Sequence, residues 1–186
     1  MSLSELNKEI QNCNKCELSK LVFNRQDVKK GYGKLYGWSN GINCHFLFLG
    51  MNPSHKRFEN QQYAFGGLSG SPGPGKRFNK LLRELDFFNE VFVDNIIHCS
   101  TVTNQIDFSC ASACSSFLLK EIEILKPKKI IAMGKKVFEF LIKIFEEKNI
   151  NLPIVCIYHP SYVFTYKKFT FQQYKEMINN VCKEKK

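Results

Sequence analysis

Three short polar segments of this sequence each follow an apolar run, and each carries a side chain able to do chemistry. The first reads GMNPSH from Gly50 and contains Asn52. The second is the pair Asp94-Asn95, and the third reads HPS from His159. An amide can hold a water or hydrogen-bond a ligand, and an imidazole can stabilise negative charge. Each segment alone is typical of an ordinary turn. Their joint placement after three predicted strands indicates one shared site.

The elements that must position these segments are predicted from hydrophobic periodicity. Short runs that are apolar on both faces indicate four buried strands, at residues 43–50, 91–98, 129–133 and 154–158. Apolar residues at helical spacing indicate helices at residues 77–85, 113–125, 137–145 and 171–182. Between them, the Gly- and Pro-rich residues 66–75 are expected to form a tight loop that leads into a helix.

Alternating strands and helices with buried strands predict an α/β fold. We expect a three-layer α/β/α sandwich with a central four-stranded parallel sheet, formed by one domain over residues 1–186. In such sheets ligands bind beyond the carboxyl ends of the strands, where the three polar segments are expected to lie.

Eight cysteines in 186 residues are many for a protein expected in a reducing compartment, where ligation explains them better than disulfides. Cys13 and Cys16 form a C-x2-C pair, and Cys99 and Cys114 follow, with Cys110 as a competitor for the last place. Four thiolates suit zinc or a [4Fe-4S] cluster, and spacing alone does not choose between them. The other three are expected in the core: Cys44, Cys156 and Cys182.

The formal net charge of +10 favours a polyanionic partner, although solubility alone is the competing interpretation. No apolar run is long enough to cross a bilayer, and the polar N-terminus does not resemble a signal peptide. We therefore expect an intracellular, cytoplasmic protein that binds no membrane and is a monomer.

The chain resembles the uracil-DNA glycosylase superfamily over most of its length, and most closely the iron-sulfur branch, family four. The segments that carry the likeness are CNKC from Cys13, FLFLGMNPS from Phe46, AFGGLSG from Ala64, VFVDNIIHC from Val91, ACSSFL from Ala113, ILKPKKIIAMG from Ile124 and YHPS from Tyr158. Three segments depart from family four. GMNP is similar to the single-strand-selective and thymine-mismatch branches, GPGKRFNKLL from Gly73 is similar to the latter, and Ser100-Thr101-Val102 replaces the usual Arg-Pro-Pro.

The resemblance implies a role for each site residue. Asn52 would hold the attacking water and His159 would stabilise the leaving base, so these two are the expected catalytic residues. The residues expected to bind the base are Gly50, Met51, Phe65, Asn95 and Ser161. Those expected to contact DNA are Ser54, Ser69, Lys76, Arg77, Lys167 and Lys168, with Tyr162, Val163 and Phe164 as candidates for a wedge. The expected ligands of a [4Fe-4S] cluster, with zinc as the lesser alternative, are Cys13, Cys16, Cys99 and Cys114.

The implied activity is that of a monofunctional DNA repair glycosylase that flips uracil, or a related deaminated base, out of DNA and hydrolyses its N-glycosidic bond. An amide at position 52 cannot accept a full proton as a carboxylate can, which predicts a slower enzyme than a relative with Asp at this position. Alternatives from the sequence are a glycosylase for mismatched thymine or hypoxanthine, a non-catalytic iron-sulfur DNA-binding protein, and a zinc-bearing nucleic-acid protein unrelated to repair.

Overall fold

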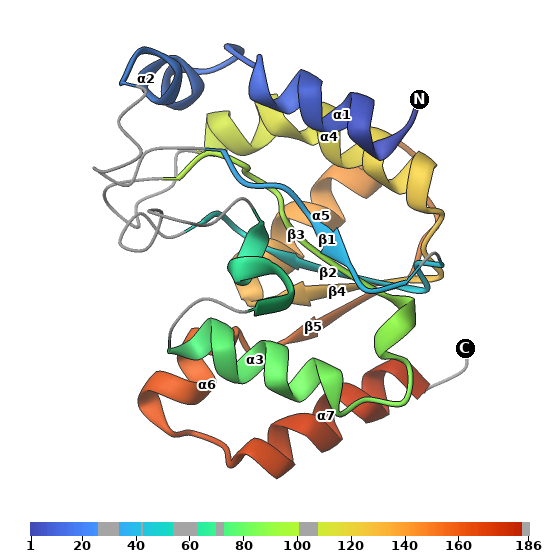
Figure 1. Cartoon of the computed structure of the whole chain (residues 1–186). Helices are drawn as coiled ribbons and strands as arrows, with labels where there is room; N and C mark the ends of the chain where they lie inside the picture. The colour runs from blue at the N-terminus through green and yellow to red at the C-terminus, as the bar shows by residue number, and fades with distance from the viewer. Residues whose placement is uncertain (26–33, 42, 54–62, 70–72, 101–107, 184–186) are drawn as a thin grey trace.

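A computed structural model gives the arrangement of the chain and describes residues 1–25, 34–41, 43–53, 63–69, 73–100 and 108–183. Its centre is a five-stranded sheet with the order β1-β3-β2-β4-β5 (Figure 1). The strands are β1 (Trp38–Ser39), β2 (Phe46–Gly50), β3 (Val91–Asn95), β4 (Lys129–Met133) and β5 (Ile154–Ile157). Strands β2 to β5 are parallel, as predicted from their apolar runs.

The expectation of a four-stranded, wholly parallel sheet is wrong by one strand. The two-residue β1 pairs antiparallel with β3, so that Trp38 lies opposite Val93. A strand this short leaves no apolar run in the sequence, and antiparallel edge strands on parallel sheets are common. The mixed α/β class is confirmed.

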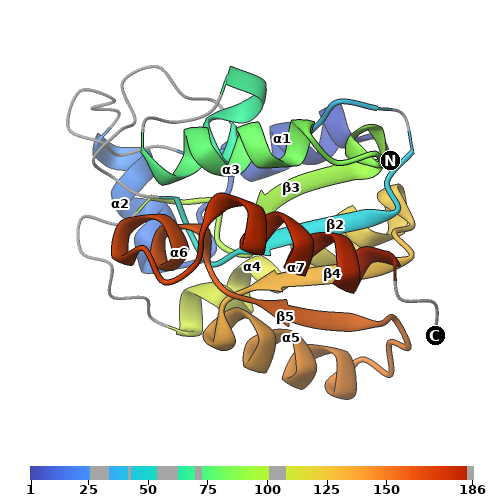
Figure 2. The ribbon, with the colours of Figure 1, turned by 90° about the horizontal axis from the view of Figure 1, so that it is seen from below.

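Helices cover both faces of the sheet. Two of them, α4 (Phe108–Leu125) and α5 (Lys135–Glu147), pack on one face around Leu47, Leu49 and Ile130. The other face is covered by α3 (Pro74–Arg83), α6 (Pro160–Tyr166) and α7 (Phe171–Lys183). Seen from below in Figure 2, α6 and α7 lie in front of the sheet.

The N-terminal arm forms a further layer outside α4. Leu6 and Ile10 of α1 (Leu3–Gln11) are buried against Phe117 of α4 (Figure 1). The helix begins with a capping box in which the Ser2 side chain accepts the Glu5 N–H and the Glu5 carboxylate accepts the Ser2 N–H. Helix α2 (Glu17–Arg25) follows directly after the CNKC segment. The arm therefore brings Cys13 and Cys16 to the end of the molecule where β3 leads into α4.

Two predictions about buried side chains need correction. Cys44 and Cys182 are in the core as expected, but Cys156 is exposed because it lies on β5, the last strand of the sheet. Of the three wedge candidates, Val163 and Phe164 are buried, and only Tyr162 is exposed. Since α6 packs on the sheet, its inward face is unavailable to DNA.

Candidate active site at the carboxyl ends of the strands

Gly50 and Asn95 end two adjacent parallel strands and lie opposite each other in register. A Cβ atom on Gly50 would stand 2.4 Å from Asn95 Oδ1 and 2.9 Å from the Phe65 ring, so only glycine fits between them. The next residue, Met51, is half-buried, and its carbonyl accepts the Ile97 N–H at 2.9 Å. The predicted base-binding residues Gly50, Phe65 and Asn95 are thus brought together.

Asn95 is a buried side chain with an unsatisfied acceptor. It is 4% exposed, and its Oδ1 has no hydrogen-bond partner among the described residues. Buried polar atoms are nearly always paired in native proteins, so an orphan at a strand end indicates an atom kept for a ligand. A donor on that ligand, such as the N–H of a base, would satisfy it.

The segment that carries Phe65 is held in an unusual backbone conformation. Phe65 itself has a φ of +52°, and Gly66 and Gly67 follow with positive φ in η3 (Ala64–Ser69). A non-glycine residue in the left-handed region is uncommon and clusters at functional sites. Trp38 fixes the start of this segment by donating from Nε1 to the Ala64 carbonyl at 2.7 Å. Asn79 of α3 donates to the Gly67 carbonyl.

His159 faces the same site from the end of β5. Its ring centroid lies 5.9 Å from that of Phe65. Its Nδ1 accepts the Ser161 N–H at 3.1 Å, and burial lowers the pKa of His159 to about 4. The ring is therefore neutral at pH 7, and because Nδ1 is an acceptor its one proton lies on Nε2. His159 is prepared to donate a hydrogen bond from Nε2.

Asn52 and Ser161, two further predicted site residues, lie at the same end of the sheet. Asn52 is half-buried directly after β2 and donates from Nδ2 to the Pro53 carbonyl at 3.1 Å. Ser161 is exposed in the first turn of α6, and its backbone rather than its hydroxyl holds the histidine. Ser54 lies outside the described residues. Ser69 is the last residue of η3, and the structure describes its backbone only.

A buried carboxyl pair behind the strands was not anticipated from the sequence. Asp94 accepts the Asn95 N–H at 2.7 Å, and the Glu121 carboxyl of α4 hydrogen-bonds Asp94. Burial, with repulsion from Asp94, raises the pKa of Glu121 well above its usual value, and burial raises that of Asp94 as well. The Gly37 N–H also stabilises Asp94, and a proton on Glu121 supplies the hydrogen bond between the two carboxyl groups. The pair fixes the backbone that presents Asn95.

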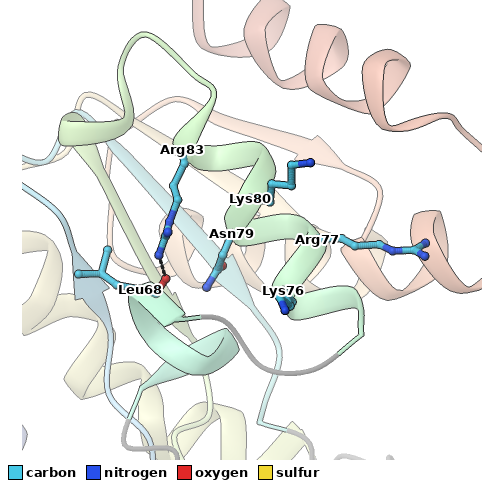
Figure 3. Close-up of a pocket in the computed structure, with 6 residues that line it drawn as sticks. All are labelled: Leu68, Lys76, Arg77, Asn79, Lys80 and Arg83. Atoms are coloured by element: carbon cyan, nitrogen blue, oxygen red, sulfur yellow. Dashed lines mark hydrogen bonds between the residues drawn. The ribbon is translucent and has the colours of Figure 1, made fainter.

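Exposed cations lie along α3, close to the site (Figure 3). Lys76 and Arg77 were predicted to contact DNA, and Lys80 and Arg83 join them around a hollow of about 350 Å³. Arg83 donates to the Leu68 carbonyl of η3. In Figure 3 the side chains of Arg83 and Arg77 extend from opposite sides of α3. The sequence held a signal for the two missed cations, since residues 76, 80 and 83 share one face at helical spacing. Lys167 and Lys168 are exposed directly after α6.

Five cysteines gather at the N-terminal arm. Burial, with smaller contributions from the neighbouring Cys16, Cys13 and Cys110, raises the pKa of Cys114 to about 12. Burial also raises the pKa of Cys99, with added repulsion from Cys114, Cys16 and Cys13, whereas Cys110 hydrogen-bonds Cys16. In the described residues no three Cys, His, Asp or Glu side chains converge as ligands of a single ion would.

Further contacts hold the arm against the body of the protein. Lys34, buried opposite Cys99 in a backbone bridge, donates from Nζ to the carbonyls of Gln11 and Cys13 at 2.7 and 2.6 Å. Lys15, inside the CNKC segment, donates to Ser116 Oγ at 3.0 Å, two residues beyond Cys114. Cys13 and Cys16 are thereby held beside Cys99 and Cys114.

Comparison with known proteins decides the family. Residues 37–183 match the sequence model of the "Uracil DNA glycosylase superfamily". The chain belongs to this superfamily. The match begins before β1 and ends at the last residue of α7, so it includes every strand of the sheet and the residues around Gly50, Asn95 and His159.

Curated relatives agree with membership of the superfamily, and a solved structure shares the fold. A type-4 uracil-DNA glycosylase of Thermotoga maritima is 27% identical over 80% of this chain and 78% of its own length. Those of Sulfurisphaera tokodaii and Archaeoglobus fulgidus are 25% and 22% identical over 90% and 99% of this chain, and 69% and 95% of their own lengths. The crystal structure of Pedobacter heparinus SMUG2 has the same fold, with a TM-score of 0.60 at 13% identity over 97% of both chains.

Proposed function

We propose that this protein removes uracil from DNA by hydrolysing the N-glycosidic bond and leaving an abasic site. The observation that carries the proposal is the meeting of Phe65, the unsatisfied Asn95 Oδ1 and the neutral His159 around Gly50. Membership of the superfamily and the names of the relatives support it. A base flipped into this site would stack on Phe65.

Asn95 would read the uracil edge. Its Oδ1 would accept the N3–H of uracil, which supplies the donor that this atom lacks, and its amide nitrogen would donate to O4. Cytosine presents an amino donor where uracil has O4 and has no hydrogen on N3. The cytosine amino donor would then face the donating amide nitrogen of Asn95, and both would stay unpaired. A buried site binds a ligand far more weakly when its polar groups are left unpaired.

His159 would act on the leaving base. As the bond to the sugar breaks, negative charge grows on the uracil O2 oxygen. A neutral imidazole that donates from Nε2 stabilises this charge without first losing a proton, which is oxyanion-type assistance. Asn52 would orient the attacking water but cannot take a full proton from it.

We propose that the cysteine set holds an iron-sulfur cluster rather than zinc. A zinc ion needs four ligands at about 2.0–2.3 Å from one point, whereas the four thiolates of a cluster bind different irons and are spread more widely. Cys13, Cys16 and Cys114 all contribute to the raised pKa of Cys99, and Cys13 and Cys16 contribute to that of Cys114, so these four lie close together. Cys110 also contributes to the pKa of Cys114 but hydrogen-bonds Cys16 and does not affect Cys99. We therefore propose Cys13, Cys16, Cys99 and Cys114 as the ligands. The bound cluster would tie the arm to the start of α4.

The test is incubation of the purified protein with labelled oligonucleotides that contain one uracil, single-stranded or paired with guanine or adenine, followed by alkali to cut abasic sites. The His159→Ala and Asn52→Ala variants run alongside. Strand cleavage by the wild type that falls in both variants is expected. Tight binding of uracil DNA without cleavage would instead favour a non-catalytic binder, which the amide at position 52 makes the second candidate.

A further inference from the structure

Exposed tyrosines gather on one side of α6. Large apolar side chains that are exposed in the described part of the chain include Tyr158, Tyr162 and Tyr166, which are 48%, 41% and 68% exposed. Scattered exposed apolar residues are normal, but a contiguous group marks a contact surface. We call these three residues the tyrosine ladder.

The rings of the ladder are already arranged for stacking. Tyr158 and Tyr162 stack with centroids 5.7 Å apart and planes 19° apart, and the Tyr166 ring lies 5.7 Å from that of Tyr162 with its plane tilted by 48°. The buried side of α6 anchors the helix through Val163 and Phe164. The spacing of four residues keeps Tyr162 and Tyr166 on one face.

The start of the ladder is also anchored. The hydroxyl of buried Tyr174 in α7 donates to the Tyr158 carbonyl, and the Phe169 ring lies 5.0 Å from that of Tyr158. Preformed surfaces bind without a large ordering cost. The tyrosine ladder can therefore bind a ligand without a large rearrangement.

The ladder adjoins the proposed base site and carries positive charge at its far end. Tyr158 directly precedes His159, and Tyr166 directly precedes the exposed Lys167 and Lys168. The chain as a whole has a formal net charge of +10. A strand that leaves the base site along α6 would meet aromatic rings first and then cations that suit its phosphates.

We propose that the tyrosine ladder is a stacking platform for the unpaired bases of single-stranded DNA next to the target nucleotide. This inference rests on the proposed function, which places the target base at His159. The bases of a single strand leave their faces free to stack on exposed rings, whereas the bases of a duplex stack on one another. Aromatic rings accept any base, because every base has a π face.

The test is binding of uracil-free oligonucleotides, measured by fluorescence anisotropy on one sequence as a single strand and as a duplex. The Tyr162→Ala/Tyr166→Ala double variant is compared with Tyr162→Phe/Tyr166→Phe, which keeps both rings. Both positions are exposed, and a thermal melt checks that each variant is folded. We expect the alanine variant to bind the single strand about tenfold more weakly and the duplex almost unchanged, with the phenylalanine variant like the wild type.

Either of two results with the alanine variant would overturn the platform: unchanged single-strand binding, or an equal loss for single strand and duplex. An equal loss in the phenylalanine variant would also do so, since the hydroxyls rather than the rings would then bind. Uracil-free DNA keeps this test separate from the proposed activity. If the ladder effect is present and no uracil is ever released, the proposed function fails and the platform stands as a single-strand binding surface.

Discussion

His159 is the residue whose protonation state the proposed chemistry depends on most. Its folded pKa of about 4 lies below the ordinary value, so the neutral ring is present at pH 7 and is lost as the pH falls through about 4. Protonation puts a hydrogen on Nδ1, which opposes the Ser161 N–H. We expect the single-turnover rate of uracil release to show no histidine step between pH 6 and 8. A step in this rate near pH 6.5 would contradict a His159 ring that stays neutral down to about pH 4.

Removing the imidazole gives a second measurement at the same residue. His159→Ala should lower the single-turnover rate by about a hundredfold to a thousandfold, the usual cost of losing one oxyanion donor. Binding of uracil DNA should change far less, because the donor acts mainly as charge develops. An equal fall in affinity and rate would mean that His159 only binds the base.

Gly50 offers a test of the site by crowding. In Gly50→Ala the added Cβ would stand 2.4 Å from Asn95 Oδ1 and 2.9 Å from the Phe65 ring, so both side chains must move. We expect uracil release to fall by at least about tenfold, since misplacing a reacting group by about 1 Å can cost a hundredfold. Near-UV circular dichroism and a thermal melt check the fold. Wild-type activity in Gly50→Ala would refute the proposed base site.

The sequence predicted some individual residues well and others poorly. Asn52, Asn95 and His159 were located because each lies at or just beyond the end of a buried strand, and parallel strands bring their carboxyl ends together. Val163 and Phe164 were wrongly taken for wedge residues, since a short helix gives too little pattern to tell its inner face from its outer one. Glu121 was missed because its partner, Asp94, lies far away in the sequence.

At the scale of elements, the Asp94–Glu121 bond joins β3 to α4. Both pKa values are raised in the folded state, so the pair adds most stability at low pH and loses it as the pH rises through those values. Glu121→Gln keeps a donor and cannot ionise, so its melting temperature should exceed that of the wild type at pH 8. Glu121→Leu should lose about 1–3 kcal/mol, because it leaves a buried Asp94 oxygen unpaired. A higher melting temperature in Glu121→Leu than in the wild type would contradict a shared proton.

The contact between the N-terminal arm and α4 yields a prediction about cluster ligands. Cys114→Ser should lose bound iron and the visible absorbance of the cluster, whereas Cys110→Ser should keep both. The reason is that Cys114 interacts electrostatically with Cys99, Cys13 and Cys16, whereas Cys110 does not affect Cys99. Iron content and absorbance of anaerobically purified variants measure this directly. Loss of iron only in Cys110→Ser would reverse the choice of fourth ligand.

Elements were predictable from the sequence where they are long or buried. The parallel strands β2 to β5 were located because both their faces are apolar. Strand β1 was missed because it has two residues, and α6 because Pro160 and Ser161 at its start are equally typical of a loop. Helix α1 buries only Leu6 and Ile10, which is too weak a stripe to stand out in a polar segment.

At the scale of the whole molecule, the positive charge should govern DNA affinity. Removing one cation that binds a phosphate should reduce the slope of log affinity against log salt by about 0.9 for a duplex. We expect Lys76→Ala/Lys80→Ala to flatten the slope by nearly twice this amount. Lys143→Ala on α5, on the opposite face of the sheet, serves as the control and should change nothing. Equal slopes in all three proteins would place the DNA elsewhere.

In the described residues no helix is long and apolar enough to cross a membrane. The expected cytoplasmic location and monomeric state both remain predictions from the sequence.

The most direct test of the central claim identifies the base that the protein releases. Oligonucleotides that contain uracil, thymine opposite guanine, hypoxanthine or cytosine would be incubated with excess protein, and the free bases separated by mass spectrometry. The hydrogen-bonding pattern at Asn95 predicts free uracil and no cytosine. Release of cytosine, or of thymine or hypoxanthine but not uracil, would contradict the proposed function.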